Sequence, residues 1–362
     1  MGKYHEQSMK KYLLSLLFIS LLLFPADTFA GAKTKIEVLS YMTSLPSQSS
    51  KKILSGQFIG WCTENDTLFT NIYAKSGKYP ALMSGDYADF GCPTGADLIT
   101  YNAYLKAHWA AGGLIEVAWH ADNPVTMEWD HTTPVNLVDL IKNGTTTNTN
   151  WKAMMDRVAI GLQDLKDNGV VVIFRPFLEM NGDWFWWGNK DGTEFKNAWI
   201  YTYNYLTTTK GLNNLLWAFS YNNNYGAAAS TYYPGYSYVD ITGVDAYPES
   251  QTGEIGAISD YSYLSGLGKP FALTEVGVCN YLGCPSPQNL SDIISDIKTY
   301  APNSIYWNNW DDTWSMDYGT NVSTLLNDPW VVNRSDNPSG AAGSGPTIQN
   351  RRPSPPSGFS IQ

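Results

Sequence analysis

Charged residues, and basic ones above all, are scarce in this chain of 362 residues. Charged side chains make up 15% of the sequence, and 23 Lys and Arg stand against 33 Asp and Glu, which gives a formal net charge of −10. A strongly basic surface, the usual means of holding nucleic acid or an anionic membrane, is therefore not expected. The composition suits a neutral partner such as a polysaccharide, and aromatic residues, which offer flat faces to sugar rings, are plentiful at 14%.

Long hydrophobic runs are also lacking, except for one near the N-terminus. The run Leu13–Phe24 follows Lys10 and Lys11 and precedes the small-residue pattern Thr28-Phe29-Ala30. It is short for a bilayer span, and its flanks are those of a secretory signal. We predict a signal peptide over residues 1–30 and a secreted protein, extracellular or periplasmic, without a membrane anchor.

Cysteine and histidine are rare, with four of each. No Cys-x-x-Cys or His-x-x-x-His spacing indicates a zinc site. An even number of cysteines in an exported chain indicates disulfides, and four cysteines allow three pairings. The cysteines are Cys62, Cys92, Cys279 and Cys284.

Short apolar segments alternate with helical segments over most of the chain. Strands are predicted at 53–57, 80–83, 113–117, 170–174, 212–219, 238–243, 269–273 and 304–307. Helices are predicted at 34–52, 68–75, 97–111, 151–168, 193–208, 255–267 and 289–300, with a loop and one short helix over 124–150. Eight such units predict an α/β fold, a (β/α)8 TIM barrel, over residues 31–333.

Two further observations concern the competing fold and the segment that follows the barrel. An open doubly wound sheet is the alternative, but no glycine-rich phosphate loop follows the first strand. Residues 334–362 are rich in Pro, Ser and Gly and lack periodicity, which predicts a linker or tail.

Polar and aromatic residues follow the predicted strands, where the active site of a barrel lies. Glu179 follows the fourth strand and Glu275 the seventh, so their side chains are expected to face each other. Two such carboxyl groups suit glycoside hydrolysis: one, kept protonated by a raised pKa in an apolar setting, donates a proton, and the other, ionised, attacks the anomeric carbon. The other candidates at strand ends are Trp61, Asp86, His120, Trp184, Asp245, Tyr247 and Trp307.

Several segments carry a family resemblance. Arg175–Gly188 resembles the acid/base signature of glycoside hydrolase family 26, and Leu273–Gly277 resembles its nucleophile segment. Trp119-His120, Tyr233-Pro234-Gly235 with Val239-Asp240, and Val244–Tyr247 also match. The family consists mainly of retaining endo-β-1,4-mannanases with a (β/α)8 fold, and it also holds β-1,3-xylanases and mixed-linkage β-glucanases.

The resemblance implies a role for each matching residue. Glu179 becomes the acid/base and Glu275 the nucleophile of a retaining enzyme that hydrolyses β-1,4-mannosidic linkages in mannan or glucomannan. It implies that the residues lining the subsites are His120, Trp184, Asp245, Tyr247 and Trp307. No metal or cofactor is implied, and a monomer acting on polysaccharide is expected.

One position departs from the family pattern. Family mannanases usually have His directly before the acid/base, and this chain has Leu178. The isobutyl group cannot form the hydrogen bonds of an imidazole, which keeps open a β-1,3-xylanase, a mixed-linkage β-glucanase or a catalytically weak carbohydrate-binding barrel.

The predicted barrel also favours one of the three possible disulfide pairings. Cys62 follows the first strand and Cys92 the second, so their loops should lie side by side on one face. Cys279 and Cys284 share the loop after the seventh strand. The pairing Cys62–Cys92 with Cys279–Cys284 is therefore preferred to pairings that cross a wider part of the rim.

Overall fold

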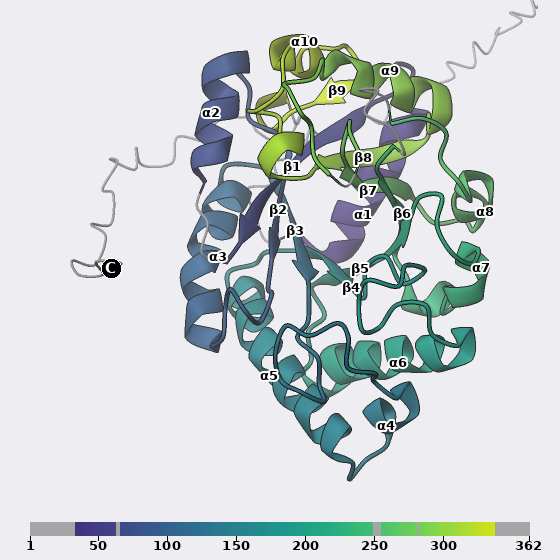
Figure 1. Cartoon of the computed structure of the whole chain (residues 1–362). Coiled ribbons are helices and arrows are strands. Elements are labelled where there is room, and N and C mark those ends of the chain that lie inside the picture. Colours follow the sequence, from purple (N-terminus) through teal and green to yellow (C-terminus); the bar gives the residue numbers. More distant parts are fainter. Residues whose placement is uncertain (1–32, 63–65, 249–254, 281, 337–362) are drawn as a thin grey trace, which may run out of the picture.

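Eight parallel strands close into a barrel surrounded by helices in the computed structural model, which describes residues 33–62, 66–248, 255–280 and 282–336 (Figure 1). The strands follow one another around the ring, and β1 pairs with both β8 and β2 to close it. The predicted TIM barrel is confirmed. The strands are β1 (Ile53–Trp61), β2 (Leu82–Asp86), β3 (Leu114–Trp119), β4 (Val172–Pro176), β5 (Leu215–Asn222), β6 (Ile241–Ala246), β7 (Phe271–Val276) and β8 (Ser304–Asn309).

All eight strands extend further toward their C-terminal ends than predicted. The fourth was expected to end at Phe174, but β4 continues through Arg175 and Pro176, and β7 includes Glu275. Pro176 is tolerated because it is the last residue of the strand. The polar residues that seemed to end each apolar run are thus strand residues at the mouth of the barrel.

The helices lie outside the strands and cover them (Figure 1). The apolar side chains on the outer strand faces are buried there, which is why the strands read as continuous hydrophobic runs. The helices are α1 (Lys35–Ser44), α2 (Thr67–Ser76), α3 (Gly95–Ala110), α4 (Leu137–Ile141), α5 (Thr146–Asp167), α6 (Gly192–Asn204), α7 (Ala229–Tyr232), α8 (Tyr261–Gly266), α9 (Ser291–Tyr300) and α10 (Val322–Leu326).

Two helices differ clearly from the predicted bounds. Helix α5 begins before Trp151, because Thr145 acts as the N-cap and its hydroxyl accepts a hydrogen bond from the Asn148 amide. The predicted helix over 255–267 is reduced to α8, because Asp260, directly before it, has a left-handed backbone (φ 54°) that a right-handed helix cannot include. Part of the segment 124–150, predicted mainly as a loop, is therefore helical. Residues 255–260, predicted as helix, are not helical.

The two ends of the described chain pack against the barrel near the N-terminal ends of its strands. Helix α1 packs against β5 and β8, and the Lys35 ammonium donates to the carbonyl oxygen of Leu215 at the start of β5. A short strand β9 (Val331–Val332) pairs with the start of β1. Arg334 then lies over the Tyr79 ring and contacts the buried His108, so the folded part continues past the predicted boundary at Asn333.

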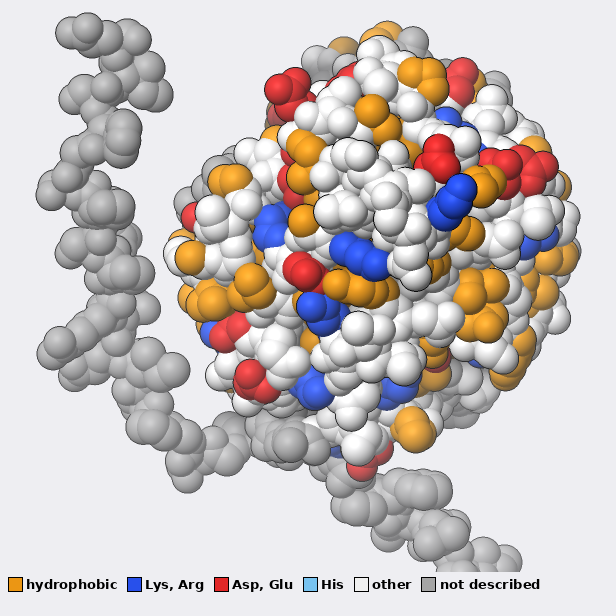
Figure 2. Space-filling view, turned by 90° about the horizontal axis from the view of Figure 1, so that it is seen from below, with side chains coloured by type: hydrophobic (Ala, Val, Ile, Leu, Met, Phe, Trp, Pro, Cys, Tyr) orange, Lys and Arg blue, Asp and Glu red, His pale blue; other side chains and the backbone are white. Residues whose placement is uncertain are grey.

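The predicted signal peptide and nearly all of the predicted tail lie outside the described residues. On the face drawn in Figure 2, Lys and Arg side chains are interspersed with Asp and Glu rather than gathered by sign. Within the described ranges, no helix is both long and apolar enough to cross a membrane.

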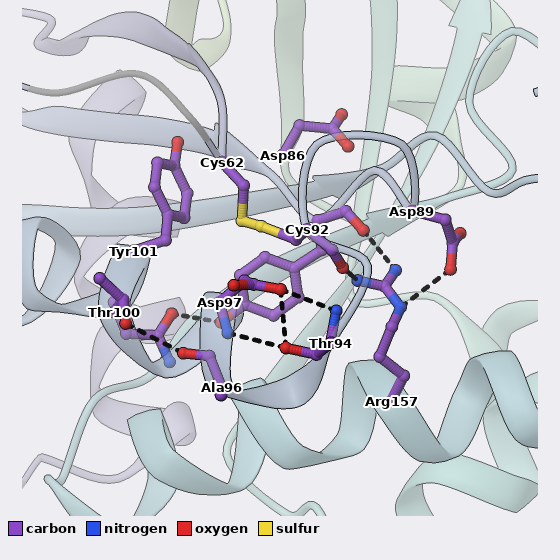
Figure 3. The surroundings of a disulfide bond; sticks show 12 residues. Cys62, Asp86, Asp89, Cys92, Thr94, Ala96, Asp97, Thr100, Tyr101 and Arg157 are labelled. Atoms are coloured by element: carbon purple, nitrogen blue, oxygen red, sulfur yellow. Dashed lines mark hydrogen bonds and ion pairs between the residues drawn. A yellow bond between two sulfur atoms is a disulfide. The ribbon is translucent and has the colours of Figure 1, made fainter. Parts of the chain in front are cut away.

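Both disulfides are present in the preferred pairing. Cys62–Cys92 joins the loops after β1 and β2, with α-carbons 5.5 Å apart, and Cys279–Cys284 closes the loop after β7, with α-carbons 5.3 Å apart. In Figure 3, Arg157 reaches from α5 to the loop that carries Cys92. It donates to the Cys92 carbonyl oxygen and forms an ion pair with Asp89 at 2.8 Å. This loop at the barrel mouth is therefore held both covalently and by a cation beneath it.

Candidate active site

A cleft of about 700 Å³ lies at the mouth of the barrel. Both candidate catalytic carboxyl groups line it, as do four aromatic side chains, two from the loop that follows Glu179 and two from the chain after β8. The lining residues are His120, Leu178, Glu179, Trp184, Phe185, Asn222, Asn223, Asn224, Tyr225, Tyr247, Pro248, Glu275, Asn280, Trp310 and Trp314.

The backbone after β4 is bent sharply to bring Glu179 into this cleft. Phe177 and Glu179 both have positive φ angles of 52°, a conformation that costs on the order of 1–3 kcal/mol per residue and is found mostly at functional sites. The Glu179 amide is anchored to the carbonyl oxygen of Ser220 on β5 at 2.9 Å. The tight loop thus points the Glu179 side chain across the barrel mouth.

Two neutral groups hold the Glu179 carboxyl group. The Trp184 indole donates to Oε2 at 2.7 Å, and the Asn222 amide donates to Oε1 at 2.6 Å. Gly182 makes the first contact possible, because a Cβ there would lie 2.4 Å from the Trp184 ring. Asn181, fully buried, links the same loop to β5 by bonding the Asn222 backbone, which fixes the second donor.

The pKa of Glu179 is raised to about 7, mainly by burial and then by the negative charge of Asp245. The direction is the predicted one, and burial is the cause that an apolar setting implies. The Trp184 and Asn222 hydrogen bonds favour the charged form and therefore oppose the rise. A carboxyl group with this pKa keeps its proton over the weakly acidic range, as a general acid requires.

Glu275 sits opposite, at the end of β7, and its partners are of a different kind. The Arg175 guanidinium lies 2.6 Å from Oε1, and the Tyr247 hydroxyl donates to Oε2 at 2.8 Å. Burial and the charge of Asp245 raise the pKa of Glu275, and Arg175 opposes them. Because no cation among the described residues contacts Glu179, we assign the first ionisation of the pair to Glu275.

The two carboxyl groups are close together. One oxygen of each of Glu179, Asp245 and Glu275 lies within 4.8 Å of the others. Retaining glycosidases hold their pair at about 5–5.5 Å, and inverting enzymes at about 6.5–9.5 Å. Three carboxyl groups are also the donor set of a cation site, but the Arg175 guanidinium already supplies the positive charge among them.

His120 occupies the wall of the cleft next to the carboxyl pair. Its Nδ1 lies 2.5 Å from Asp86 Oδ2, and its backbone amide donates to Asp86 Oδ1 at 3.1 Å. Asp86, at the end of β2, therefore fixes the imidazole and leaves Nε2 for the cleft. Trp61 backs the imidazole with its ring centre 5.1 Å away, and Cys62 ties the Trp61 loop in place.

Two predicted sugar contacts do not line the cleft. Asp245 is fully buried below it, where it accepts from Arg175 at 3.1 Å and from Ser220 at 2.7 Å. Trp307 is fully buried too. Its neighbours Tyr306 and Asn308 both point into the barrel toward Glu116, so the alternation of a strand turns Trp307 outward, away from the mouth.

The comparisons with known proteins agree with this geometry. The model of glycosyl hydrolase family 26 matches residues 28–336. The chain belongs to glycosyl hydrolase family 26. It is therefore a glycoside hydrolase, and the predicted family is confirmed.

Relatives in family 26 cover nearly all of the barrel. The chain is 32% identical over 358 residues to the mannan endo-1,4-beta-mannosidase of Bacillus subtilis strain 168, covering 90% of this chain and 96% of the relative. It is 34% identical over 324 residues to mannan endo-1,4-beta-mannosidase A and B of Caldalkalibacillus mannanilyticus, covering 84% of this chain but only 61% of that longer protein. A solved structure of the Bacillus subtilis mannanase man26 superposes with a TM-score of 0.75 at 32% identity, covering 86% and 95% of the two chains.

The family 26 site contains residues that the sequence reasoning passed over. Arg175 and Asn222 lie just past the predicted strands 170–174 and 212–219 and received no individual role, although one contacts Glu275 and the other Glu179. Trp310 and Trp314 take the place expected of Trp307 in the cleft wall. The available signal was the presence of a lone cation inside an apolar strand, because a buried Arg requires acidic partners.

Proposed function

We propose that the protein is a secreted retaining endo-β-1,4-mannanase, with Glu179 as acid/base and Glu275 as nucleophile. The observation that carries the proposal is the pair itself. The two carboxyl groups lie within 4.8 Å of each other, one held by neutral donors and the other by a guanidinium and a phenol.

The first step forms a glycosyl-enzyme. A Glu275 oxygen attacks the anomeric carbon while the bond from that carbon to the glycosidic oxygen breaks, and Glu179 transfers its proton to the departing oxygen. Arg175, in an ion pair with Oε1, and Tyr247, which donates a hydrogen bond to Oε2, favour the ionised form of Glu275 for this attack.

The second step releases the sugar. Water attacks the same anomeric carbon, Glu179 takes a proton from that water, and the bond to Glu275 breaks. Two inversions return the original configuration. Glu179 is suited to both proton transfers because its raised pKa, about 7, lies close to neutrality.

Sugar rings are expected to contact the walls of the cleft through stacking and hydrogen bonds. Trp184 and Trp310 offer indole faces there, and His120 and Tyr247 offer polar atoms. Asp245, buried under Arg175, acts on the substrate only through its neighbours.

The choice of mannan rests on the relatives, which are mannan endo-1,4-beta-mannosidases by name. Leu178 lines the cleft where the family usually has His. A β-1,3-xylan or a mixed-linkage glucan is the competing substrate. Secretion rests on the predicted signal peptide over residues 1–30 and on the two disulfides, and we propose that the barrel acts as a monomer because one chain builds the whole cleft.

A substrate panel tests the proposal. Purified protein is given mannan, glucomannan, β-1,3-xylan and mixed-linkage glucan, and products are separated by chromatography, with Glu275→Ala as the inactive control. We expect internal cleavage of mannan and glucomannan. Cleavage of xylan or mixed-linkage glucan alone refutes the substrate, and binding of a polysaccharide without any products refutes the enzyme.

A further inference from the structure

Glu116, a fully buried acid outside the cleft, lies directly below Arg175. It belongs to β3, and its Oε1 is 3.5 Å from Arg175 Nε. Ala118, level with Arg175 in the strand register, lies on the same face two residues further along β3. Because Ala118 carries only a methyl group, it leaves room for the guanidinium above Glu116.

Arg175 is held at three nitrogens by three different carboxyl groups. Its Nε faces Glu116, its Nη1 lies 3.1 Å from Asp245, and its Nη2 lies 2.6 Å from Glu275. The guanidinium is planar, so a contact at Nε together with one at Nη1 fixes the direction in which Nη2 points. Only the Nη2 contact reaches the cleft.

Glu116 is itself held by donors from the neighbouring strand β2 and from β8, which does not pair with β3. The Tyr306 hydroxyl donates to Oε2 at 2.6 Å, and the Ser84 hydroxyl donates to Oε1 at 2.9 Å. The Asn308 amide adds a longer contact to Oε1 at 3.4 Å. Burial raises the pKa of Glu116, whereas Arg175 and the Tyr306 and Ser84 hydroxyls favour its anion, which can anchor a cation.

We propose, given the acid/base and nucleophile roles above, that Glu116 is a positioning residue for catalysis: it anchors Arg175 from beneath the cleft and so sets the orientation and the charge environment of Glu275. Three acids share one guanidinium. The negative charge of Glu116 partly offsets the positive charge of Arg175, so Arg175 stabilises the Glu275 carboxylate less. Glu275 therefore ionises at a higher pH than it does with a neutral residue at position 116.

The other charged and titratable groups around these acids come from four strands. Glu275 faces Arg175, Asp245, Glu179 and Tyr247, and Glu116 faces Arg175, Tyr306 and, through space, Asp245. His120, which is itself paired with Asp86, favours the ionised form of Asp245. Glu116→Gln changes none of these other groups, so its comparison with the wild-type protein isolates position 116.

The test is the pH dependence of kcat/KM for Glu116→Gln on the best substrate of the wild-type protein. Glutamine keeps the shape and removes the charge. We expect the acid limb to move down by about one pH unit, kcat to fall about tenfold to a hundredfold because Arg175 loses its anchor, and KM and the oligosaccharide Kd from calorimetry to stay within about twofold. The basic limb, which reports Glu179, should not move.

Two further variants keep the test decisive. Ser55→Ala removes a buried hydroxyl that bonds Asn333, away from Arg175, and should lower Tm without moving either limb. If Glu116→Gln does not fold, Tyr306→Phe removes only the phenol contact and should move the acid limb down by a smaller amount, because Glu116 then ionises less readily. An acid limb that stays in place or rises overturns the proposal. A wild-type protein that hydrolyses nothing overturns the proposed function instead.

Discussion

The two sides of the cleft present the same type of side chain in different surroundings. Glu179, after β4, and Glu275, in β7, are nearly equally buried, at 8% and 4% exposure. Neutral donors, Trp184 and Asn222, hold the first, whereas Arg175 and Tyr247 hold the second. Burial alone therefore does not separate an acid from a nucleophile; the charge of the partner does.

The largest expected effect follows from removing the carboxyl group on the cationic side. Glu275→Ala should lower kcat by at least about 10⁴-fold, since no other group can form the covalent bond. Added azide should restore part of the turnover and yield a glycosyl azide of inverted configuration, which NMR identifies. A variant that keeps a tenth of the wild-type rate contradicts the nucleophile role.

Removing the proton on the neutral side should have a smaller effect that depends on the substrate. Glu179→Gln should slow polysaccharide hydrolysis by about 10²–10⁴-fold, the usual contribution of a general acid. Release of a good leaving group, as from an aryl glycoside, needs no proton, so the first step should change little. Stopped-flow measurement of the aryl burst checks this, and equal losses on both substrates argue against the assignment.

The donors themselves sharpen the comparison, because each should move a different limb of the pH profile. Trp184→Phe removes a donor that favours ionised Glu179, so the pKa of Glu179 and the basic limb should rise by about half to one unit. Tyr247→Phe removes a donor to Glu275, so the acid limb should rise and kcat should fall about ten- to hundredfold. The measurement is kcat/KM against pH; movement of the same limb in both variants breaks the comparison.

The smallest expected effects concern the two disulfides, one on each side of the cleft. Cys62–Cys92 closes a separation of 30 residues and Cys279–Cys284 one of 5. In the chain-entropy model these are worth about 3.6 and about 2 kcal/mol. Replacing both cysteines of a pair by Ser should therefore lower Tm more for the first pair, as measured by calorimetry, and the reverse order contradicts the model.

Much of the fold and the catalytic pair could be predicted because they depend on local patterns. The eight apolar runs mark strands buried on both faces, and Glu179 and Glu275 each follow or end one of them. Their closeness follows from the barrel, which gathers strand ends on one face.

The details at the mouth could not be predicted, because polarity there does not end a strand. Asp86, Arg175, Asp245 and Glu275 are polar, yet all are strand residues: Arg175 pairs with Asp245 and Glu275, and Asp86 pairs with His120. Trp307 was expected at the mouth for the same reason. Because β8 continues to Asn309, the strand alternation turns Trp307 outward, and Trp310 reaches the cleft instead.

The central claim is that Glu275 attacks directly and Glu179 acts twice, which makes the enzyme retaining. Proton NMR of the first products released from a β-linked manno-oligosaccharide, recorded before mutarotation, measures this directly. The account predicts that the newly formed reducing end is the β-anomer. An α-anomer as the first product would contradict it and would require a water between the two carboxyl groups.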